Sequence, residues 1–174
     1  MKKISIKNII AAIVSIALFI LLDQVTKVLA VVHLKDKNPL ILIEGVFELQ
    51  YLENRGSAFG MMQGARTFFI ISTLILCVIL CFLYVRIPRE KKYLPLRVIA
   101  VLFFAGAIGN FIDRVKQGFV VDFFYFSLID FPIFNVADIY VVTATIALMI
   151  FILFYYKEED LERIFPKRKK KEEH

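Results

Sequence analysis

The chain has 174 residues, of which 59% are hydrophobic and 22% are charged, and its mean hydropathy is +0.71. Soluble domains contain about 45–50% apolar residues, so this composition argues against an ordinary water-soluble enzyme, and its high hydrophobicity excludes a disordered chain. The net charge of +6 would suggest nucleic-acid binding in a soluble protein. Here the basic residues gather at the ends of apolar blocks, where they set the orientation of a membrane protein, and we expect no nucleic-acid partner.

Four apolar blocks are long enough to cross a bilayer as helices, which takes roughly 20 residues each. They cover about residues 9–32, 67–85, 94–112 and 133–156. The sequence therefore predicts an all-α polytopic membrane protein, with a four-helix transmembrane bundle in one domain over residues 1–156 and a charged tail over 157–174. Cys77 and Cys81 lie inside the second block and predict neither a disulfide framework nor a zinc site.

Three basic segments, residues 2–7, 86–92 and 167–171, fall on one side of this even-numbered bundle. The positive-inside rule makes that side cytoplasmic, which places both termini inside and leaves two external segments over about 34–66 and 115–132. Residues 40–52 alternate partly between apolar and polar around Gly45, which predicts a short external hairpin or small sheet. A hairpin alone is marginally stable, so it should lean on the bundle or on the bilayer surface.

Polar residues interrupt the apolar pattern in five places, each at or near the outer end of a span. In the first, Asp23 and Lys27 are four residues apart and share a helix face. We expect an ion pair that supports a site, with Lys27 reaching outward to the headgroups. In the second, Asn54 and Gly56 precede the second span. This segment is either a plain loop or one that presents a carboxamide to a peptide backbone.

The third group lies at the end of the third span, where Asn110, Asp113 and Arg114 share a helix face. Arg114 could pair with Asp113 and keep that carboxylate ionised. Alternatively, it could hold a lipid phosphate or a substrate carbonyl. Gly109, together with small neighbours, lets another helix approach closely.

The last two groups each contain one aspartate. Asp122 stands among apolar and aromatic residues and has no compensating charge nearby in sequence, so it needs a partner in space. Asn135 and Asp138 lie three residues apart at the outer start of the fourth span, where an acid also favours the helix dipole. Pro132 ends the loop between the two aspartates, so both can reach the outer membrane surface.

Two close carboxylates in a partly apolar setting do not both ionise readily. One can then take a proton from water while the other polarises a carbonyl, which is sufficient for amide hydrolysis without a metal or a covalent intermediate. The chain has only two histidines, His33 and His174, which supports neither a catalytic triad nor a histidine-based zinc site. We expect no metal and no cofactor.

The five groups, in this order on four spans, resemble the lipoprotein signal peptidases (signal peptidase II) of bacteria. The residues that carry the resemblance extend over the chain to about Tyr156: Asp23-Gln24-x-x-Lys27, Asn54-Arg55-Gly56-x-Ala58-Phe59-Gly60, Gly109-Asn110-x-x-Asp113-Arg114, Val121-Asp122-Phe123 and Phe134-Asn135-x-Ala137-Asp138.

This resemblance implies an aspartyl endopeptidase of the bacterial plasma membrane, with its active site at the outer face and Asp122 and Asp138 as the catalytic pair. The substrate would be a prolipoprotein carrying diacylglycerol on a cysteine, cleaved just before that cysteine. The resemblance implies that Asn54, Asn110, Arg114 and Asn135 line the site, and that Asp23 and Lys27 support it. We expect membrane lipids as partners and a monomer.

Two questions stay open from the residues alone. Asp113 is a third carboxylate near the same surface, and spacing does not exclude it from the pair. A four-helix protein with intramembrane acids could also be a proton-coupled transporter or a non-catalytic scaffold. A transporter, however, is expected to carry its acids near the bilayer midplane.

Overall fold

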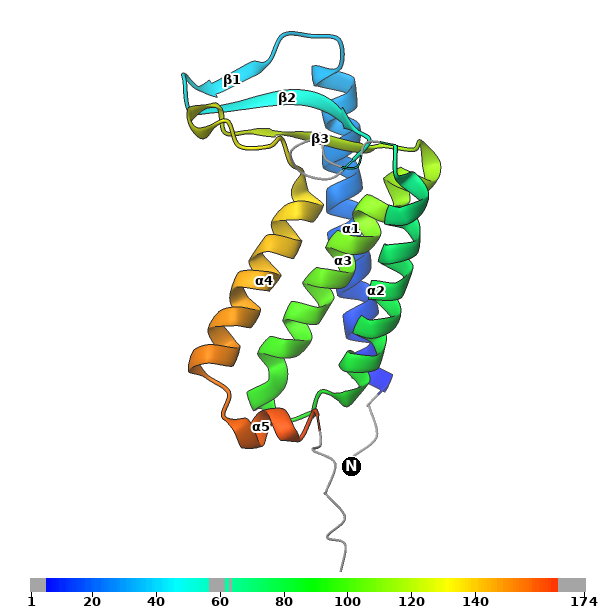
Figure 1. Cartoon of the computed structure of the whole chain (residues 1–174), viewed down its shortest axis with the longest axis vertical. Coiled ribbons are helices and arrows are strands. Elements are labelled where there is room, and N and C mark those ends of the chain that lie inside the picture. Colours follow the sequence, from blue (N-terminus) through cyan, green and yellow to red (C-terminus); the bar gives the residue numbers. More distant parts are fainter. Residues whose placement is uncertain (1–5, 57–61, 63, 166–174) are drawn as a thin grey trace, which may run out of the picture.

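The structure is a computed structural model that describes residues 6–56, 62 and 64–165. Its elements in chain order are α1 (Ile6–Leu34), β1 (Leu40–Ile43), β2 (Phe47–Asn54), α2 (Arg66–Arg86), η2 (Lys91–Tyr93), α3 (Leu94–Lys116), β3 (Val120–Tyr125), η3 (Ser127–Ile129), α4 (Val136–Phe154) and α5 (Glu158–Glu162). The sheet lies at one end of a helical bundle, and α5 lies at the other end, where α1 begins (Figure 1). Motif residues 57–60 and the basic residues at 2, 3 and 167–171 lie outside the described residues.

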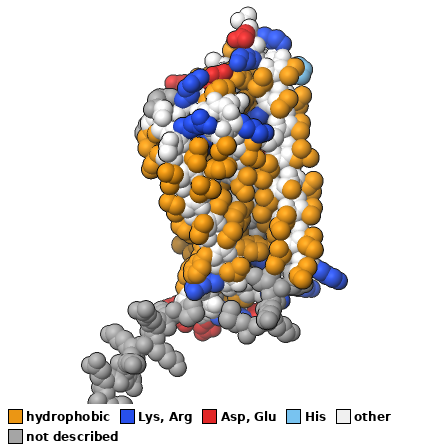
Figure 2. Space-filling view, turned by 90° about the vertical axis from the view of Figure 1, so that its right-hand side faces the viewer, with side chains coloured by type: hydrophobic (Ala, Val, Ile, Leu, Met, Phe, Trp, Pro, Cys, Tyr) orange, Lys and Arg blue, Asp and Glu red, His pale blue; other side chains and the backbone are white. Residues whose placement is uncertain are grey.

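Four of the described helical segments are long and apolar enough to cross a membrane: Ile6–Leu34, Arg66–Arg86, Lys91–Lys116 and Val136–Phe154. The face in Figure 2 carries a broad hydrophobic band over the helices, with charged groups gathered towards the two ends. The predicted bundle of four membrane-spanning helices with a small sheet is therefore confirmed.

The fourth helix begins later than the apolar block suggests. Phe134 is used in an isolated antiparallel bridge to Phe124 of β3, and Asn135 then caps α4, which starts at Val136. The third helix also differs from its apolar block, because the C-terminal end of α3 extends beyond the block to Lys116. The polar residues at its end therefore lie on regular helix, with fixed directions for their side chains.

The sheet has three antiparallel strands in the order β1-β2-β3. Gly45, at φ +67°, lies in the turn that joins β1 to β2, as the alternation around it predicts. The sequence did not predict the third strand. In its register, Leu52 faces Asp122 and Asn54 faces Val120. Since side chains two residues apart share a face of a sheet, Asn54 lies diagonally beside Asp122.

The central helix is α3, which packs against α1, α2 and α4. Its close approach to α4 depends on glycine. A Cβ atom on Gly106 would lie 2.6 Å from the carbonyl oxygen of Ala137, and one on Gly109 would lie 2.6 Å from Oδ2 of Asp23. Both distances are shorter than real Cβ contacts, so the absence of side chains at these positions sets how closely α4 and Asp23 approach α3.

The segment expected to be a charged tail begins with a short helix, α5. In α5, Asp160 pairs with Lys92, and nearby Arg163 pairs with Glu90. These contacts hold the segment after α4 against the connection between α2 and α3.

The glycine contact in α3 yields a stability prediction. Gly106→Ala should lower the free energy of unfolding by about 1–3 kcal/mol, and with it the Tm of the purified protein, because the added methyl group meets the backbone carbonyl of Ala137 as well as the side chain of Val141. On intrinsic helix propensity alone the same change would stabilise the protein by about 1 kcal/mol. An unchanged or raised Tm in detergent would contradict this account of α3–α4 packing.

Candidate functional site

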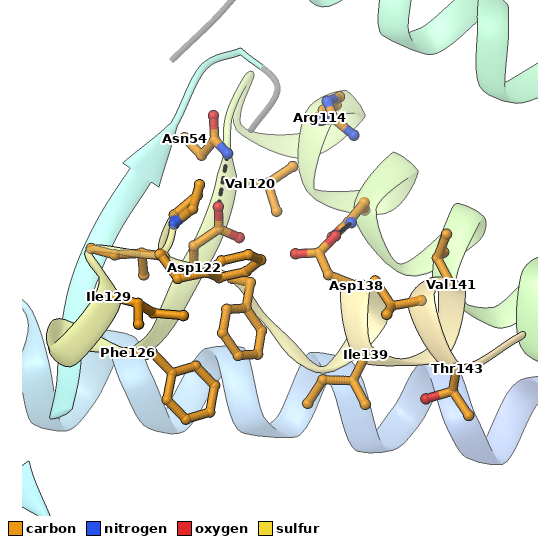
Figure 3. Close-up of a pocket in the computed structure, with 16 residues that line it drawn as sticks. Asn54, Arg114, Val120, Asp122, Phe126, Ile129, Asp138, Ile139, Val141 and Thr143 are labelled. Carbon is orange, nitrogen blue, oxygen red and sulfur yellow. Dashed lines mark hydrogen bonds between the residues drawn. The ribbon is translucent and has the colours of Figure 1, made fainter. Parts of the chain in front are cut away.

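One pocket lies where the sheet meets the adjacent ends of α3 and α4, and it has a volume of about 640 Å³. Its polar lining comes from β2, α3, β3 and α4, whereas the segment from Phe126 to Thr143 supplies most of its apolar wall. In Figure 3, the side chains of Asp122 and Asp138 point into the same part of this pocket. The polar residues that line it are Asn54, Asn110, Arg114, Asp122, Asp138 and Thr143.

Asp122 is almost fully buried on β3, at 1% exposure. Its two carboxylate oxygens accept hydrogen bonds from Nδ2 of Asn135 at 2.6 Å and Nδ2 of Asn54 at 2.8 Å. Burial, and then the nearby Asp138 carboxylate, raise the pKa of Asp122 from its ordinary 3.8 to about 7, against the opposing effect of the two amide donors. The partners that this residue needs in space are therefore two amide donors, and a second acid, Asp138, lies in the same pocket.

Asp138 lies in the first turn of α4, where it forms a capping box with Asn135. One carboxylate oxygen accepts the backbone N–H of Asn135 at 3.1 Å, and the other accepts Nδ2 of Asn110 at 2.8 Å. The side chain thus caps its helix and also faces the pocket. The two interpretations of this residue from sequence, a helix-dipole acid and a site acid, are both compatible with its position.

Arg114 reaches the same pocket from the end of α3. Its guanidinium donates to the carbonyl oxygen of Gly56 at 3.3 Å and lies over the ring of Phe69, 4.5 Å from its centroid. Gly56 also donates its N–H to Oδ1 of Asn54. Gly56 therefore connects the two polar side chains on this side of the pocket.

Beneath the pocket, Lys27 is buried among acids. Its ammonium lies 2.9 Å from Oδ2 of Asp23 and 2.9 Å from Oδ2 of Asp113. The expected Asp23–Lys27 ion pair is present, but the expectation that Lys27 reaches outward is wrong, because its side chain is only 3% exposed. Of the two roles considered for Arg114, pairing with Asp113 is not the one the structure shows: Asp113 pairs with Lys27, and the guanidinium of Arg114 donates to the carbonyl oxygen of Gly56.

The structure brings together the side chains that the sequence singled out, in two layers. The upper layer surrounds the pocket, and the lower layer consists of Asp23, Lys27 and Asp113. Asp113 belongs to the lower layer and does not line the pocket, whereas Asp122 and Asp138 both do.

Two contributors were missed. Gln24 donates to Asp113 at 3.0 Å, so it joins the lower layer. Arg66 donates to the carbonyl oxygens of Arg114 and Val115, each at 2.7 Å, and so caps the end of α3. Gln24 follows Asp23 directly and was visible as a polar residue in an apolar block. Arg66 looks like an ordinary basic residue flanking a span.

The arrangement suits acid–base chemistry on a neutral group. One carboxyl with a pKa near 7 lies across a shared pocket from a second carboxylate, and an arginine lies at the rim. Such a pair can hold a single proton between two acids. The apolar wall beside the pair can accommodate a lipid-like or apolar group.

The chain is similar to known proteins both in sequence and in fold. Residues 15–154 match the family model described as signal peptidase (SPase) II. A lipoprotein signal peptidase of Clostridioides difficile (strain 630) is 42% identical over 143 residues, which cover 82% of this chain and 95% of that protein. One of Streptococcus thermophilus (strain CNRZ 1066) is 39% identical and covers 92% of this chain and 97% of its own length.

A solved structure described as a bacterial membrane enzyme superimposes with a TM-score of 0.74 at 32% identity, covering 92% of this chain and 93% of that one. A second one has the same TM-score at 34% identity and covers 90% of this chain and 99% of its own. The chain is a multi-pass membrane protein and belongs to the signal peptidase II family of peptidases.

Proposed function

We propose that this chain is an aspartic endopeptidase that removes the signal peptide from diacylglyceryl-modified bacterial prolipoproteins, cutting just before the lipidated cysteine. The observation that carries the proposal is the pair of carboxyl groups, Asp122 and Asp138, in one partly apolar pocket. Relatives of nearly the same length are named lipoprotein signal peptidases, which supports the substrate class.

In the proposed reaction, Asp138 is the anionic base. It lies at a helix N-terminus, where negative charge is favoured, and it accepts two N–H groups. Asp122 holds the proton, since it is buried on a strand and its pKa is about 7. A water molecule then attacks the scissile carbonyl carbon while Asp138 takes one water proton and Asp122 protonates the carbonyl oxygen.

The resulting gem-diol collapses when Asp138 delivers its proton to the leaving nitrogen and Asp122 regains a proton from a hydroxyl of the diol. The C–N bond breaks, one water molecule has been added, and both acids return to their starting states. Neither a metal nor a covalent intermediate takes part in this cycle.

Other pocket residues would hold the substrate. Arg114 has donors beyond the one that Gly56 accepts, and these suit an oxygen acceptor such as a substrate carbonyl or a lipid headgroup. The apolar wall suits the acyl chains or the apolar signal segment. Binding energy from these remote parts would fix the scissile amide beside the two acids.

We place the chain in the bacterial plasma membrane with both termini in the cytoplasm. The basic residues between α2 and α3 lie at the end opposite the sheet, and the positive-inside rule makes their side cytoplasmic. The pocket then faces the outer surface, where a lipid-anchored cysteine would present its peptide bond. In this proposal, residues 1–156 are the peptidase domain of a monomer, and the basic tail contacts anionic lipid on the inner surface.

The first prediction of the proposed function concerns the two acids. Asp122→Asn and Asp138→Asn should each abolish cleavage of a diacylglyceryl-modified prolipoprotein in a gel-shift assay with detergent-purified protein, because neither variant retains the acid–base pair. Acid–base catalysis contributes about 10²–10⁴-fold, so any residual rate should fall below the range of the assay.

Asp130→Asn is the matched control, because Asp130 lies on the same connection between α3 and α4, and its exposed side chain accepts a hydrogen bond from the hydroxyl of Tyr125. It should cleave at the wild-type rate. Full activity in Asp122→Asn would remove Asp122 from the mechanism and make Asp113 the candidate partner of Asp138.

The second prediction concerns pH. Because Asp122 must hold a proton, and loses it as the pH rises through about 7, kcat/KM should fall about tenfold per pH unit on the alkaline side. The pH profile of kcat/KM with a lipidated substrate measures this limb. A profile that is flat or rising between pH 7 and 9 would contradict the assignment of the acid.

A further inference from the structure

The carboxamide groups around the two acids all point their NH₂ ends at a carboxylate of Asp122 or Asp138. Asn54 donates its Nδ2 to Asp122, and its Oδ1 accepts the backbone N–H of Gly56 at 3.0 Å. Asn135 donates its Nδ2 to Asp122, and its Oδ1 accepts the backbone N–H of Asp138 at 3.0 Å. In both cases a backbone N–H, which can only donate, holds the oxygen end, so the NH₂ end must face the acid.

Asn110 follows the same rule with a different anchor. Its Nδ2 donates to Asp138 at 2.8 Å, while its Oδ1 accepts Nζ of Lys27 at 2.8 Å and Nδ2 of Asn135 at 3.1 Å. An ammonium group has three donors and no acceptor. Lys27 therefore fixes which end of the Asn110 amide faces Asp138.

Lys27 is itself held firmly. Its three ammonium protons match three acceptors, which are carboxylate oxygens of Asp23 and Asp113 and the amide oxygen of Asn110. Asp23 is fully buried and accepts the backbone N–H of Ala137 at 3.0 Å. The ammonium is thus tied to α1, α3 and the start of α4.

We propose that Lys27 is a positioning residue for peptide-bond cleavage, which acts through Asn110 by holding that amide with its NH₂ group towards Asp138. The inference rests on the proposed function, in which Asp138 is the base. With the amide reversed, a carbonyl oxygen would face the Asp138 carboxylate, and the two acceptors would repel. Asp138 would then need the proton itself, which would exchange the roles of the two acids.

The decisive variant is Asn110→Asp. It keeps an oxygen towards Lys27 and replaces only the NH₂ group that faces Asp138 with a second oxygen. An added carboxylate also suits the ammonium, so the fold should be retained. We expect kcat to fall about 100-fold, the lower end of what acid–base groups contribute, with KM and Tm close to the wild-type values.

The pH profile separates this role from a structural one. A protonated carboxyl can donate where a carboxylate cannot, so the rate of Asn110→Asp relative to wild type should rise as the pH falls. The charged groups that face position 110 are Lys27 and Asp23 on α1, Asp113 and Arg114 on α3, Asp122 on β3 and Asp138 on α4. These groups are present in both the wild type and the variant. The ratio of the two cleavage rates therefore follows the titration of the carboxyl group introduced at position 110.

Gln117→Glu is the matched control. It makes the same amide-to-acid change on an exposed side chain just after α3, whose amide nitrogen donates to the carbonyl oxygen of Phe119. Its kcat should equal that of the wild type at every pH. An Asn110→Asp variant with wild-type kcat, or a relative rate that does not change with pH, would overturn the proposal.

A double-mutant cycle tests whether Lys27 acts through Asn110. Lys27→Met and Asn110→Ala are compared singly and together in an Asp113→Asn background. In that background, removal of the Lys27 ammonium leaves only one of its two carboxylate partners, Asp23, buried without a cation. If the inference is correct, the double variant loses no more kcat than the more damaging single change. Additive losses would show that Lys27 acts independently of Asn110 and would overturn the proposal. Failure of the proposed function would be recognised separately, by a wild-type protein that does not cleave the lipidated substrate or by cleavage that persists in Asp138→Asn.

Discussion

The site depends on one buried ammonium group. Lys27 joins α1 to α3 through Asp113, and its partner Asp23 reaches the start of α4. Charges inside a membrane protein are costly unless they are paired and hydrogen-bonded, and all three charges here meet that condition. Because α3 lacks side chains at Gly106 and Gly109, α4 and Asp23 come close enough for the network to close.

That network determines where the upper layer lies. The start of α4 is fixed by Asp23, and it carries Asp138 into the pocket and the buried Asn135 into contact with Asp122. The sheet brings Asp122 and Asn54 from the other side, through the register of β2 with β3. An acid on a strand and an acid on a helix therefore share one pocket, and amide groups donate hydrogen bonds to each of them. This is the physical basis of the proposed aspartic mechanism.

Much of the fold could be predicted from local patterns, because an apolar block of helical length in a chain of this composition has little alternative to a membrane span. Asp122 and Asp138 stood out because a charged group in an apolar context has a high free-energy cost. What the sequence could not provide was long-range pairing. Arg114 is adjacent to Asp113 and was the obvious partner, yet the close packing of α1 on α3 brings Lys27 there instead.

The pairing of the third strand and the role of Arg66 were also beyond local patterns. Five of the six residues of β3 are β-branched or aromatic, which favours a strand, but this composition does not give the register that β3 adopts on β2. Arg66 caps α3 from the start of α2, so its role depends on the packing of these two helices. In each case a local pattern identified the element or the residue type, and tertiary packing supplied the partner.

The most direct test of the central claim is an infrared titration of the carboxyl groups in protein labelled with ¹³C-aspartate. If Asp122 holds the proton of the pair, the spectrum contains a protonated-carboxyl band that is lost as the pH rises through about 7. This band should be absent from Asp122→Asn and retained in Asp130→Asn. A wild-type protein with no such band below pH 7, or a band that persists in Asp122→Asn, would contradict the claim that Asp122 holds the proton of the pair.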